Sequence, residues 1–117
     1  MKNGVGMAVF KTSERETVTG GIIAETLRSS GKYLILDVVI KNNLNEQIII
    51  SQSHLFLIDG KGRKYSVDTK AHRYVNAYNM NDYYAEYEEL NPGLIKGVGI
   101  IFDVPYDLGS VGKLILT

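Results

Sequence analysis

The sequence contains no cysteine, and proline occupies only two of its 117 positions. Without cysteine the chain can form neither a disulfide nor a thiolate metal site, and both exported and cytosolic proteins can have this composition. No apolar run approaches the roughly 20 residues that a membrane-spanning helix needs. Residues 1–10 also lack the apolar run and the cleavage site of a signal peptide, so the sequence as given carries no export signal.

An excess of charge of either sign is also missing, because 13 basic residues balance 13 acidic ones. Without a net field, neither nucleic acid nor an anionic membrane surface is an expected partner. The hydrophobic content of 44% and the charged content of 22% are ordinary for a folded globular protein. We therefore expect a single domain over residues 1–117.

The strongest strand signal lies at residues 31–43. Successive strand side chains point to opposite faces of a sheet, so alternation places one wholly apolar set on a core face: Leu34, Leu36, Val38 and Ile40. The opposite face is half apolar, because Ile35 and Val39 lie on it. We expect another part of the chain to cover that second face.

Other strand signals are shorter and are separated by turn residues such as those of Asp59-Gly60-Lys61-Gly62. They lie at residues 5–10, 48–50, 54–58, 63–67, 98–104 and 114–116. Seven or eight strands at spacings of ~8 to 12 residues predict an all-β antiparallel β-sandwich. Its predicted core consists of Leu34, Leu36, Val38, Ile40, Leu55, Leu57, Ile100, Phe102 and Val104.

Three segments lack a clear period. Residues 13–21 begin with a helix capping box, Ser13 to Glu16, but poor helix formers follow, so a loop is predicted there. Residues 22–27 are too few to settle a period, and a strand is favoured over a helical turn. Residues 69–90 fit neither a helix nor a strand throughout and are predicted to form an irregular excursion.

That excursion holds the best candidate for a functional surface, a set of five tyrosines: Tyr74, Tyr78, Tyr83, Tyr84 and Tyr87. Tyrosine offers a large amphipathic contact area at a small entropic cost, and binding surfaces are enriched in it. The alternative is structural, because the same rings could cover Ile35 and Val39 while their hydroxyls reach water.

Catalytic and metal-binding signals are weak. His54 and His72 could each join a hydrolytic triad, but no nucleophile elbow is present, and a surface or structural histidine is the favoured interpretation. The acids show no calcium-loop spacing and are interpreted as solvated; they are Asp59, Asp68, Asp82, Glu86, Glu88 and Glu89. Glycine pairs lack the third glycine of a dinucleotide loop. No catalytic residue, metal or cofactor is therefore predicted.

Three stretches in order resemble a known family: Gly-Lys-Tyr-Leu-Ile-Leu-Asp-Val-Val-Ile-Lys-Asn at 31–42, Leu-Phe-Leu-Ile-Asp-Gly-Lys-Gly-Arg-Lys-Tyr at 55–65, and Leu-Asn-Pro-Gly at 90–93 continuing to Phe-Asp-Val-Pro at 102–105. The sequence is similar over residues 31–117 to a domain of unknown function in exported lipoproteins of Gram-positive bacteria. That domain is an immunoglobulin-like sandwich akin to the mycobacterial immunoprotective extracellular protein. The resemblance implies an extracellular or cell-surface location, with membrane contact only through a lipid anchor that this sequence lacks.

The resulting hypothesis is a non-catalytic extracytoplasmic binding module that contacts an unknown protein or cell-envelope component through the five tyrosines. One alternative is a structural or self-associating module that forms a weak homo-oligomer, because short edge strands and a half-apolar outer face favour association. A hydrolase or a metal-dependent enzyme is the remaining alternative, and nothing in the residue spacing supports it.

Overall fold

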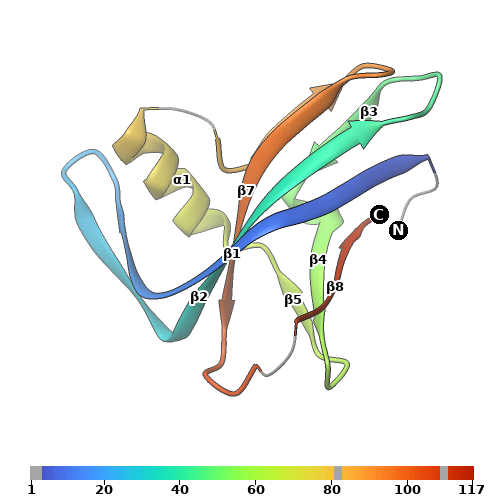
Figure 1. The fold of residues 1–117 in the computed structure, drawn as a ribbon. Helices are drawn as coiled ribbons and strands as arrows, with labels where there is room; N and C mark the ends of the chain where they lie inside the picture. The colour runs from blue at the N-terminus through green and yellow to red at the C-terminus, as the bar shows by residue number, and fades with distance from the viewer. Residues whose placement is uncertain (1–3, 81–82, 109–110) are drawn as a thin grey trace.

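The computed structural model describes residues 4–80, 83–108 and 111–117. The described residues form eight β-strands, one α-helix and a short 3₁₀ helix (Figure 1). In chain order these are β1 (Val5–Gly20), β2 (Glu25–Asn42), β3 (Ile48–Ser51), η1 (Gln52–His54), β4 (Leu55–Asp59), β5 (Lys64–Ser66), α1 (Thr69–Asn79), β6 (Tyr87–Leu90), β7 (Ile95–Val104) and β8 (Val111–Leu116).

The strands form two layers with the main hydrophobic core between them. One layer is the sheet β1-β2-β7, and the other consists of the pair β3-β6 and the sheet β5-β4-β8. Every ladder between these strands is antiparallel. The all-β immunoglobulin-like sandwich of seven or eight strands predicted from the sequence is therefore confirmed.

The core contains all nine predicted side chains, and each is at most 2% exposed: Leu34, Leu36, Val38, Ile40, Leu55, Leu57, Ile100, Phe102 and Val104. Burying a side chain of this size stabilises the fold by roughly 1.5 to 3 kcal/mol. The alternation of apolar residues along β2 and β7 is thus the main determinant of the sandwich.

The hairpin of β1 and β2 is much longer than the sequence predicted. β1 continues to Gly20, through most of the segment 13–21 that was predicted as a loop, and the chain turns at residues 21–24. The strand favoured for residues 22–27 is present only from Glu25, where β2 begins. β2 pairs with β7 from Lys32 to Lys41, so its first residues pair with β1 alone and form a two-stranded arm. Polar residues are tolerated in β1 because it is an edge strand with water beside it.

The excursion predicted to be irregular, residues 69–90, contains the helix α1 and the strand β6, so that prediction was wrong. The carboxylate of Asp68 caps the helix by accepting a hydrogen bond from Ala71 N at 2.9 Å. The buried residues of α1 recur at helical spacing: Ala71, His72, Val75 and Asn76.

Helix α1 packs on the outer face of β1-β2-β7, which confirms that part of the chain covers the half-apolar face of β2. A second hydrophobic cluster lies at this contact: Val18, Tyr33, Ile35, Ala71, Val75 and Ile101, with Leu27 and Tyr84 partly buried beside it. Figure 1 shows α1 alongside the distal part of the β1–β2 hairpin. Within the described part of the chain, no helix has the length and apolar character to cross a membrane.

Candidate functional site

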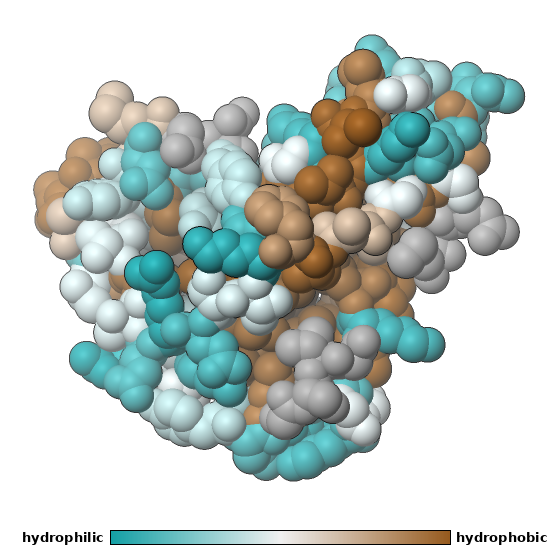
Figure 2. Space-filling model, viewed as in Figure 1, coloured by the Kyte–Doolittle hydropathy of each residue, from teal (hydrophilic) through white to brown (hydrophobic). Residues whose placement is uncertain are grey.

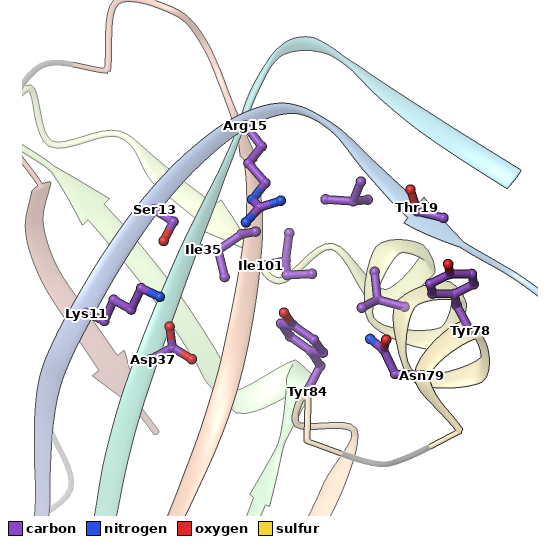
Figure 3. Close-up of a pocket in the computed structure, with 12 residues that line it drawn as sticks. Lys11, Ser13, Arg15, Thr19, Ile35, Asp37, Tyr78, Asn79, Tyr84 and Ile101 are labelled. Carbon is purple, nitrogen blue, oxygen red and sulfur yellow. The ribbon is translucent and has the colours of Figure 1, made fainter. Parts of the chain in front are cut away.

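A surface hollow of about 340 Å³ lies where the C-terminal half of α1 meets the outer face of the sheet, and we call it the α1 groove. Residues of β1, β2, β7 and α1 line it, together with one residue of the segment after the helix (Figure 3). These are Lys11, Ser13, Arg15, Val18, Thr19, Ile35, Asp37, Val75, Tyr78, Asn79, Tyr84 and Ile101.

The strand register explains why the polar residues of β1 share the groove. Lys11 pairs with Asp37 of β2 and Ser13 with Ile35, and directly opposed residues of an antiparallel pair lie on the same face. Arg15 follows two residues later on that face. The buried side chains of Ile35 and Ile101 form an apolar floor, and the polar side chains surround it.

Two cationic side chains reach the groove from β1. In Figure 3 the ammonium of Lys11 extends toward Asp37, and the guanidinium of Arg15 extends over the apolar floor in the direction of Tyr84. Neither Lys11 nor Arg15 forms an ion pair with any residue that the structure describes. The positive charges of Lys11 and Arg15 are therefore available to a ligand. At Lys11 the effective charge is reduced by Asp37, which lies opposite it on β2.

The carboxylate of Asp37 accepts a hydrogen bond from the hydroxyl of Tyr83. Burial, this hydrogen bond and the negative charge of Asp37 raise the pKa of Tyr83 to about 12, so the phenol stays protonated and continues to donate. The ring of Tyr84 meets that of Tyr83 edge-on, with 5.4 Å between the ring centroids. Burial and Asp37 also raise the pKa of Tyr84.

His72 joins the helix to the sheet behind these tyrosines. Its Nε2 accepts a hydrogen bond from Ile101 N at 2.7 Å, and its Nδ1 donates to Ala85 O at 2.8 Å. Burial lowers the pKa of His72 to about 4, although the Ala85 carbonyl and Asp68 act in the opposite direction. The imidazole is therefore neutral and fully buried at physiological pH, which matches the structural role favoured from the sequence.

The structure distributes the five candidate tyrosines over three places. Tyr78 and Tyr84 line the α1 groove, and Tyr83 lies beside it. Tyr74 packs against the turn of the β1–β2 hairpin, where a Cβ on Gly20 would come within 2.4 Å of the Tyr74 Cβ. Tyr87 lies on β6, 57% exposed and outside the groove.

The alternative of a structural cover applies to two of these rings. Tyr83 and Tyr84 are half-buried over Gly99, where an added Cβ would approach both rings to within 2.8 Å. Both rings therefore cover the sheet beside Asp37. This place is next to Ile35, one of the two residues that the structural alternative expected the tyrosines to cover. Tyr78 is 47% exposed and keeps the area that a binding residue needs.

Sequence reasoning missed six polar residues of the groove: Lys11, Ser13, Arg15, Thr19, Asp37 and Asn79. A signal for three of them was present, because Lys11, Ser13 and Arg15 occupy every second position and would share a face in a strand. Residues 13–21 were instead predicted as a loop because poor helix formers follow the capping box there. Asn79 could be placed only after the helix was recognised.

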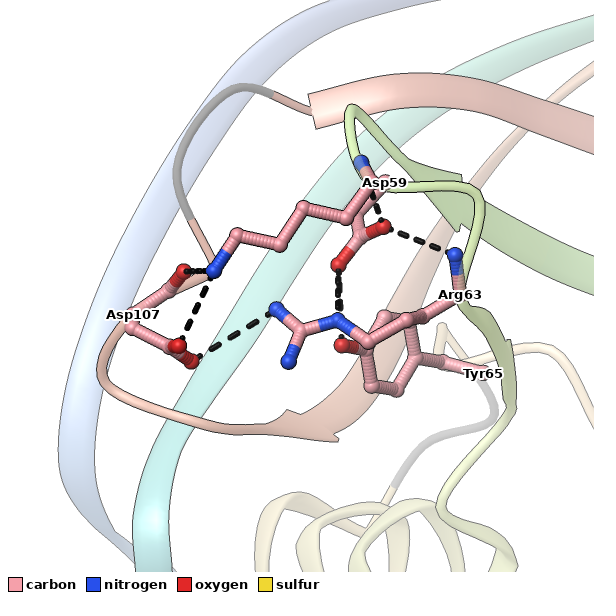
Figure 4. A network of polar contacts seen from close by, with 5 residues as sticks. Asp59, Arg63, Tyr65 and Asp107 are labelled. Carbon is pink, nitrogen blue, oxygen red and sulfur yellow. Dashed lines mark hydrogen bonds and ion pairs between the residues drawn. The ribbon is translucent and has the colours of Figure 1, made fainter.

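The acids considered as metal ligands are mostly engaged within the fold. Asp59 is buried, not solvated as predicted, and its carboxylate accepts hydrogen bonds from Arg63 Nε at 2.7 Å and from Tyr65 (Figure 4). Arg63 also reaches Asp107. Burial would raise the pKa of Asp59, but the hydrogen bonds from Arg63, Tyr65 and Lys61 lower it to about 2.

Two other acids have structural partners, since Asp68 caps α1 and Glu88 pairs with Lys96. Glu86 and Glu89 are exposed, and Asp82 lies outside the described residues. Over residues 4–80, 83–108 and 111–117, no three His, Asp or Glu side chains are grouped so that they could hold a metal ion.

The fold and the helix on its outer face define the class: an immunoglobulin-like β-sandwich of eight strands with one α-helix packed on the sheet β1-β2-β7. The chain belongs to the family described as domain of unknown function DUF4352, whose model matches residues 7–116. The match confirms the resemblance to a domain of unknown function. It also extends the resemblance beyond residues 31–117 to include most of β1.

Two solved structures have the same fold. The yjhA protein from Bacillus subtilis is 12% identical, with a TM-score of 0.65, and the match covers 90% of this chain and 68% of that one. A conserved hypothetical protein from Bacillus anthracis is 16% identical, with a TM-score of 0.62, and the match covers 92% and 77% of the two chains. A search of curated proteins found no match.

Proposed function

We propose that this domain is a non-catalytic binding module that uses the α1 groove to hold an acidic group of its partner. The observation that carries this proposal is that Lys11 and Arg15 of β1 line the same hollow as the exposed ring of Tyr78, around an apolar floor. Tyrosine and arginine are enriched at binding surfaces, and arginine pairs with carboxylates and phosphates through two parallel hydrogen bonds.

The groove suits an acidic group better than a basic one. Asp37 is the single acid among the described residues that line the groove, and the hydroxyl of Tyr83 already engages it, whereas Arg15 has no acid opposite it in the strand register. Thr19, Tyr78 and Asn79 line the same hollow and offer further hydrogen-bond donors. An extended acidic peptide or an anionic envelope polymer has the shape and charge to use this surface.

The histidines support a binding role over a hydrolytic one. Both ring nitrogens of His72 are occupied by backbone partners inside the fold, so this imidazole is not placed to exchange protons with a substrate. His54 lies in η1, which contributes no residue to the α1 groove. We accordingly assign no catalytic residue to this domain.

The resemblance described above supports an extracytoplasmic setting, as the folded domain of a Gram-positive lipoprotein. In that setting the partner of the groove would be another envelope protein or an anionic component of the cell wall. This assignment would fail if labelling of intact cells with a membrane-impermeant reagent left the protein unmodified while lysed cells were labelled.

Fluorescence anisotropy with a labelled oligoglutamate peptide tests the binding function, with an oligolysine peptide of the same length as the ligand control. We expect saturable binding of oligoglutamate only. The double variant Lys11→Gln with Arg15→Gln should weaken it by about tenfold or more, since charged hydrogen bonds contribute about 1.5 to 3 kcal/mol and 1.4 kcal/mol is a factor of ten. Tyr78→Ala should also weaken it.

A matched control removes two cations elsewhere. Lys64 on β5 and Lys113 on β8 are exposed and belong to the opposite layer of the sandwich. The variant Lys64→Gln with Lys113→Gln has the same net charge as the groove variant, so it should bind oligoglutamate as the wild type does. If both double variants lost the same amount of affinity for oligoglutamate, the loss would follow from net charge alone. That result would refute a specific site.

Self-association is a second candidate function, and the open edge of β1 favours it. Val9 and Phe10 on this edge strand are 46% and 61% exposed, and edge strands can pair with a second copy. Sedimentation velocity over a wide range of concentration tests it. A monomer at every concentration would eliminate this candidate and leave the binding module unaffected.

A further inference from the structure

The turn of the β1–β2 hairpin carries two of the three most exposed large hydrophobic side chains of the described residues. Ile22 is 92% exposed and Ile23 is 78% exposed. Figure 2 shows hydrophobic surface at the left edge of the molecule, where Figure 1 places this turn. We call residues 21–24 the hairpin tip. Two adjacent isoleucines held almost wholly in water are unfavourable unless a second surface removes them from it.

The hairpin tip is fixed in position by the helix. Gly21 N donates a hydrogen bond to Tyr74 O at 2.8 Å, and the ring of Tyr74 lies against Gly21, whose φ of +77° favours glycine. An added Cβ at Gly21 would lie 3.6 Å from that ring. The contact between Gly21 and Tyr74 therefore fixes the turn that carries the two isoleucines. Their side chains cannot pack back onto the sheet unless this contact breaks.

Two cations lie beside the hairpin tip. Lys70 Nζ is 5.5 Å and Arg73 Cζ is 5.8 Å from the centroid of the Tyr74 ring. Neither cation has an ion-pair partner among the residues with described positions. Glu25 is the nearest acid to the hairpin tip along the chain, two residues after Ile23. With Lys70 and Arg73 on one side of the balance and Glu25 on the other, the local excess is one positive charge.

From this arrangement we propose that the hairpin tip inserts Ile22 and Ile23 into an anionic lipid surface, with Lys70 and Arg73 at the headgroups and Tyr74 at the interface. Proteins that attach peripherally to membranes do so through aliphatic side chains, an aromatic ring at the interface and flanking cations. The chain has no net charge, so the attraction is local. The sequence predicted no such contact because it could not reveal the exposure of this turn.

Lipid fits the hairpin tip better than a second protein does. A stable protein interface removes about 800 Å² from each partner, which a convex turn with two apolar residues cannot supply. A bilayer deforms around a protruding turn and needs no complementary pocket. The site is also separate from the α1 groove, because none of the residues of the hairpin tip lines the groove.

Co-sedimentation of the whole chain with vesicles tests the proposal. We expect binding to vesicles of phosphatidylcholine mixed with phosphatidylglycerol, and much weaker binding to phosphatidylcholine alone. Ile22→Ser with Ile23→Ser should reduce the partition coefficient by about tenfold or more, because burying each side chain favours the bound state. Lys70→Gln with Arg73→Gln should reduce it by about 30-fold, roughly fivefold for each cation.

The variant Leu94→Ser with Ile95→Ser is the matched control, since it removes two side chains that are 52% and 61% exposed before and at the start of β7. It should bind the mixed vesicles as the wild type does. The proposal is overturned if the wild type does not bind them or if both serine pairs behave alike. It is also overturned if the hairpin-tip variant loses self-association in sedimentation velocity, because a second copy would then be the occupant.

Discussion

His72 on α1 and Ile101 on β7 are joined by a hydrogen bond of 2.7 Å, in which the imidazole Nε2 accepts the backbone N–H. This bond fixes the helix on the outer face of the sheet, next to the apolar floor of the α1 groove. It requires an imidazole that is neutral at Nε2. The position of the groove wall therefore depends on the protonation state of one buried side chain.

The first prediction is a loss of stability in mild acid. The pKa of His72 is about 4 in the folded chain and 6.5 in its ordinary state, so the unfolded chain binds the proton more tightly. Stability contributed by the neutral imidazole is complete above pH 6.5 and is lost as the pH falls toward 4, by about 3 kcal/mol in total. Urea denaturation at a series of pH values measures this loss.

The variant His72→Gln isolates the contribution of His72. It should be less stable at neutral pH and should show a weaker dependence of stability on pH between pH 6.5 and 4. The carboxylate of Asp59, with a pKa of about 2, loses its stabilising effect only below about pH 4, so the two effects occupy different pH ranges. An unchanged slope in His72→Gln would contradict the assignment.

The second prediction concerns the core. Val38 is fully buried between the two layers, so Val38→Asp should prevent folding, because an unpaired buried charge costs several kcal/mol against a total stability of about 5 to 15 kcal/mol. Val39→Asp, on the partly exposed outer face of the same strand, is the matched control and should remain folded. Circular dichroism and thermal melting distinguish the two, and a cooperative melt of Val38→Asp near the wild-type midpoint would contradict the core assignment.

The third prediction concerns close packing at a glycine. A Cβ on Gly31 would lie 2.2 Å from the Val104 carbonyl oxygen, so Gly31→Ala should force β2 and the end of β7 apart and cost about 1 to 3 kcal/mol. Gly97 has open space around it, and Gly97→Ala should change the free energy of unfolding by less than about 0.5 kcal/mol. Equal stability of the two variants in urea would show that the chain does not pass as close at Gly31 as described.

The fourth prediction separates the two kinds of tyrosine. Tyr84→Ala should cost roughly 1.5 to 3 kcal/mol of stability, because its half-buried ring packs on His72 and Tyr83. Tyr87→Ala should leave the free energy of unfolding within about 0.5 kcal/mol of the wild type, since its ring is 57% exposed. Chemical denaturation of both variants measures the difference. If Tyr84→Ala were as stable as the wild type, Tyr84 would not be a structural cover and would again be a candidate binding residue.

Apolar alternation made the sandwich predictable. Every second residue is a buried aliphatic or aromatic side chain from Leu34 to Ile40 of β2 and from Val98 to Val104 of β7, so the sequence itself indicates which face of these segments lies inside. Helix α1 was missed because Tyr74, Asn76 and Tyr78 are weak helix formers, and tertiary packing overrides that preference. The Asp68 cap and the helical spacing of Ala71 and Val75 were signals that the tyrosines obscured.

The candidate site was only partly predictable, because it is assembled from segments that are distant in the sequence. Tyr78 and Tyr84 were found from composition, but Lys11 and Arg15 lie on an edge strand whose exposure removes the apolar alternation that identifies strands. The exposure of Ile22 depends on where the hairpin turns. Register between β1 and β2 determines that position, and no local pattern specifies it.

The most direct test of the α1 groove is a map of backbone amide chemical shifts of the ¹⁵N-labelled chain during titration with unlabelled oligoglutamate. We predict that the largest changes occur at Lys11, Arg15, Tyr78 and Asn79, which line one hollow although they belong to β1 and α1. Shifts on both elements at one common dissociation constant would support a single acidic-group site there. Changes confined to the opposite layer, β5-β4-β8, or no saturable change at all, would contradict the proposed binding function.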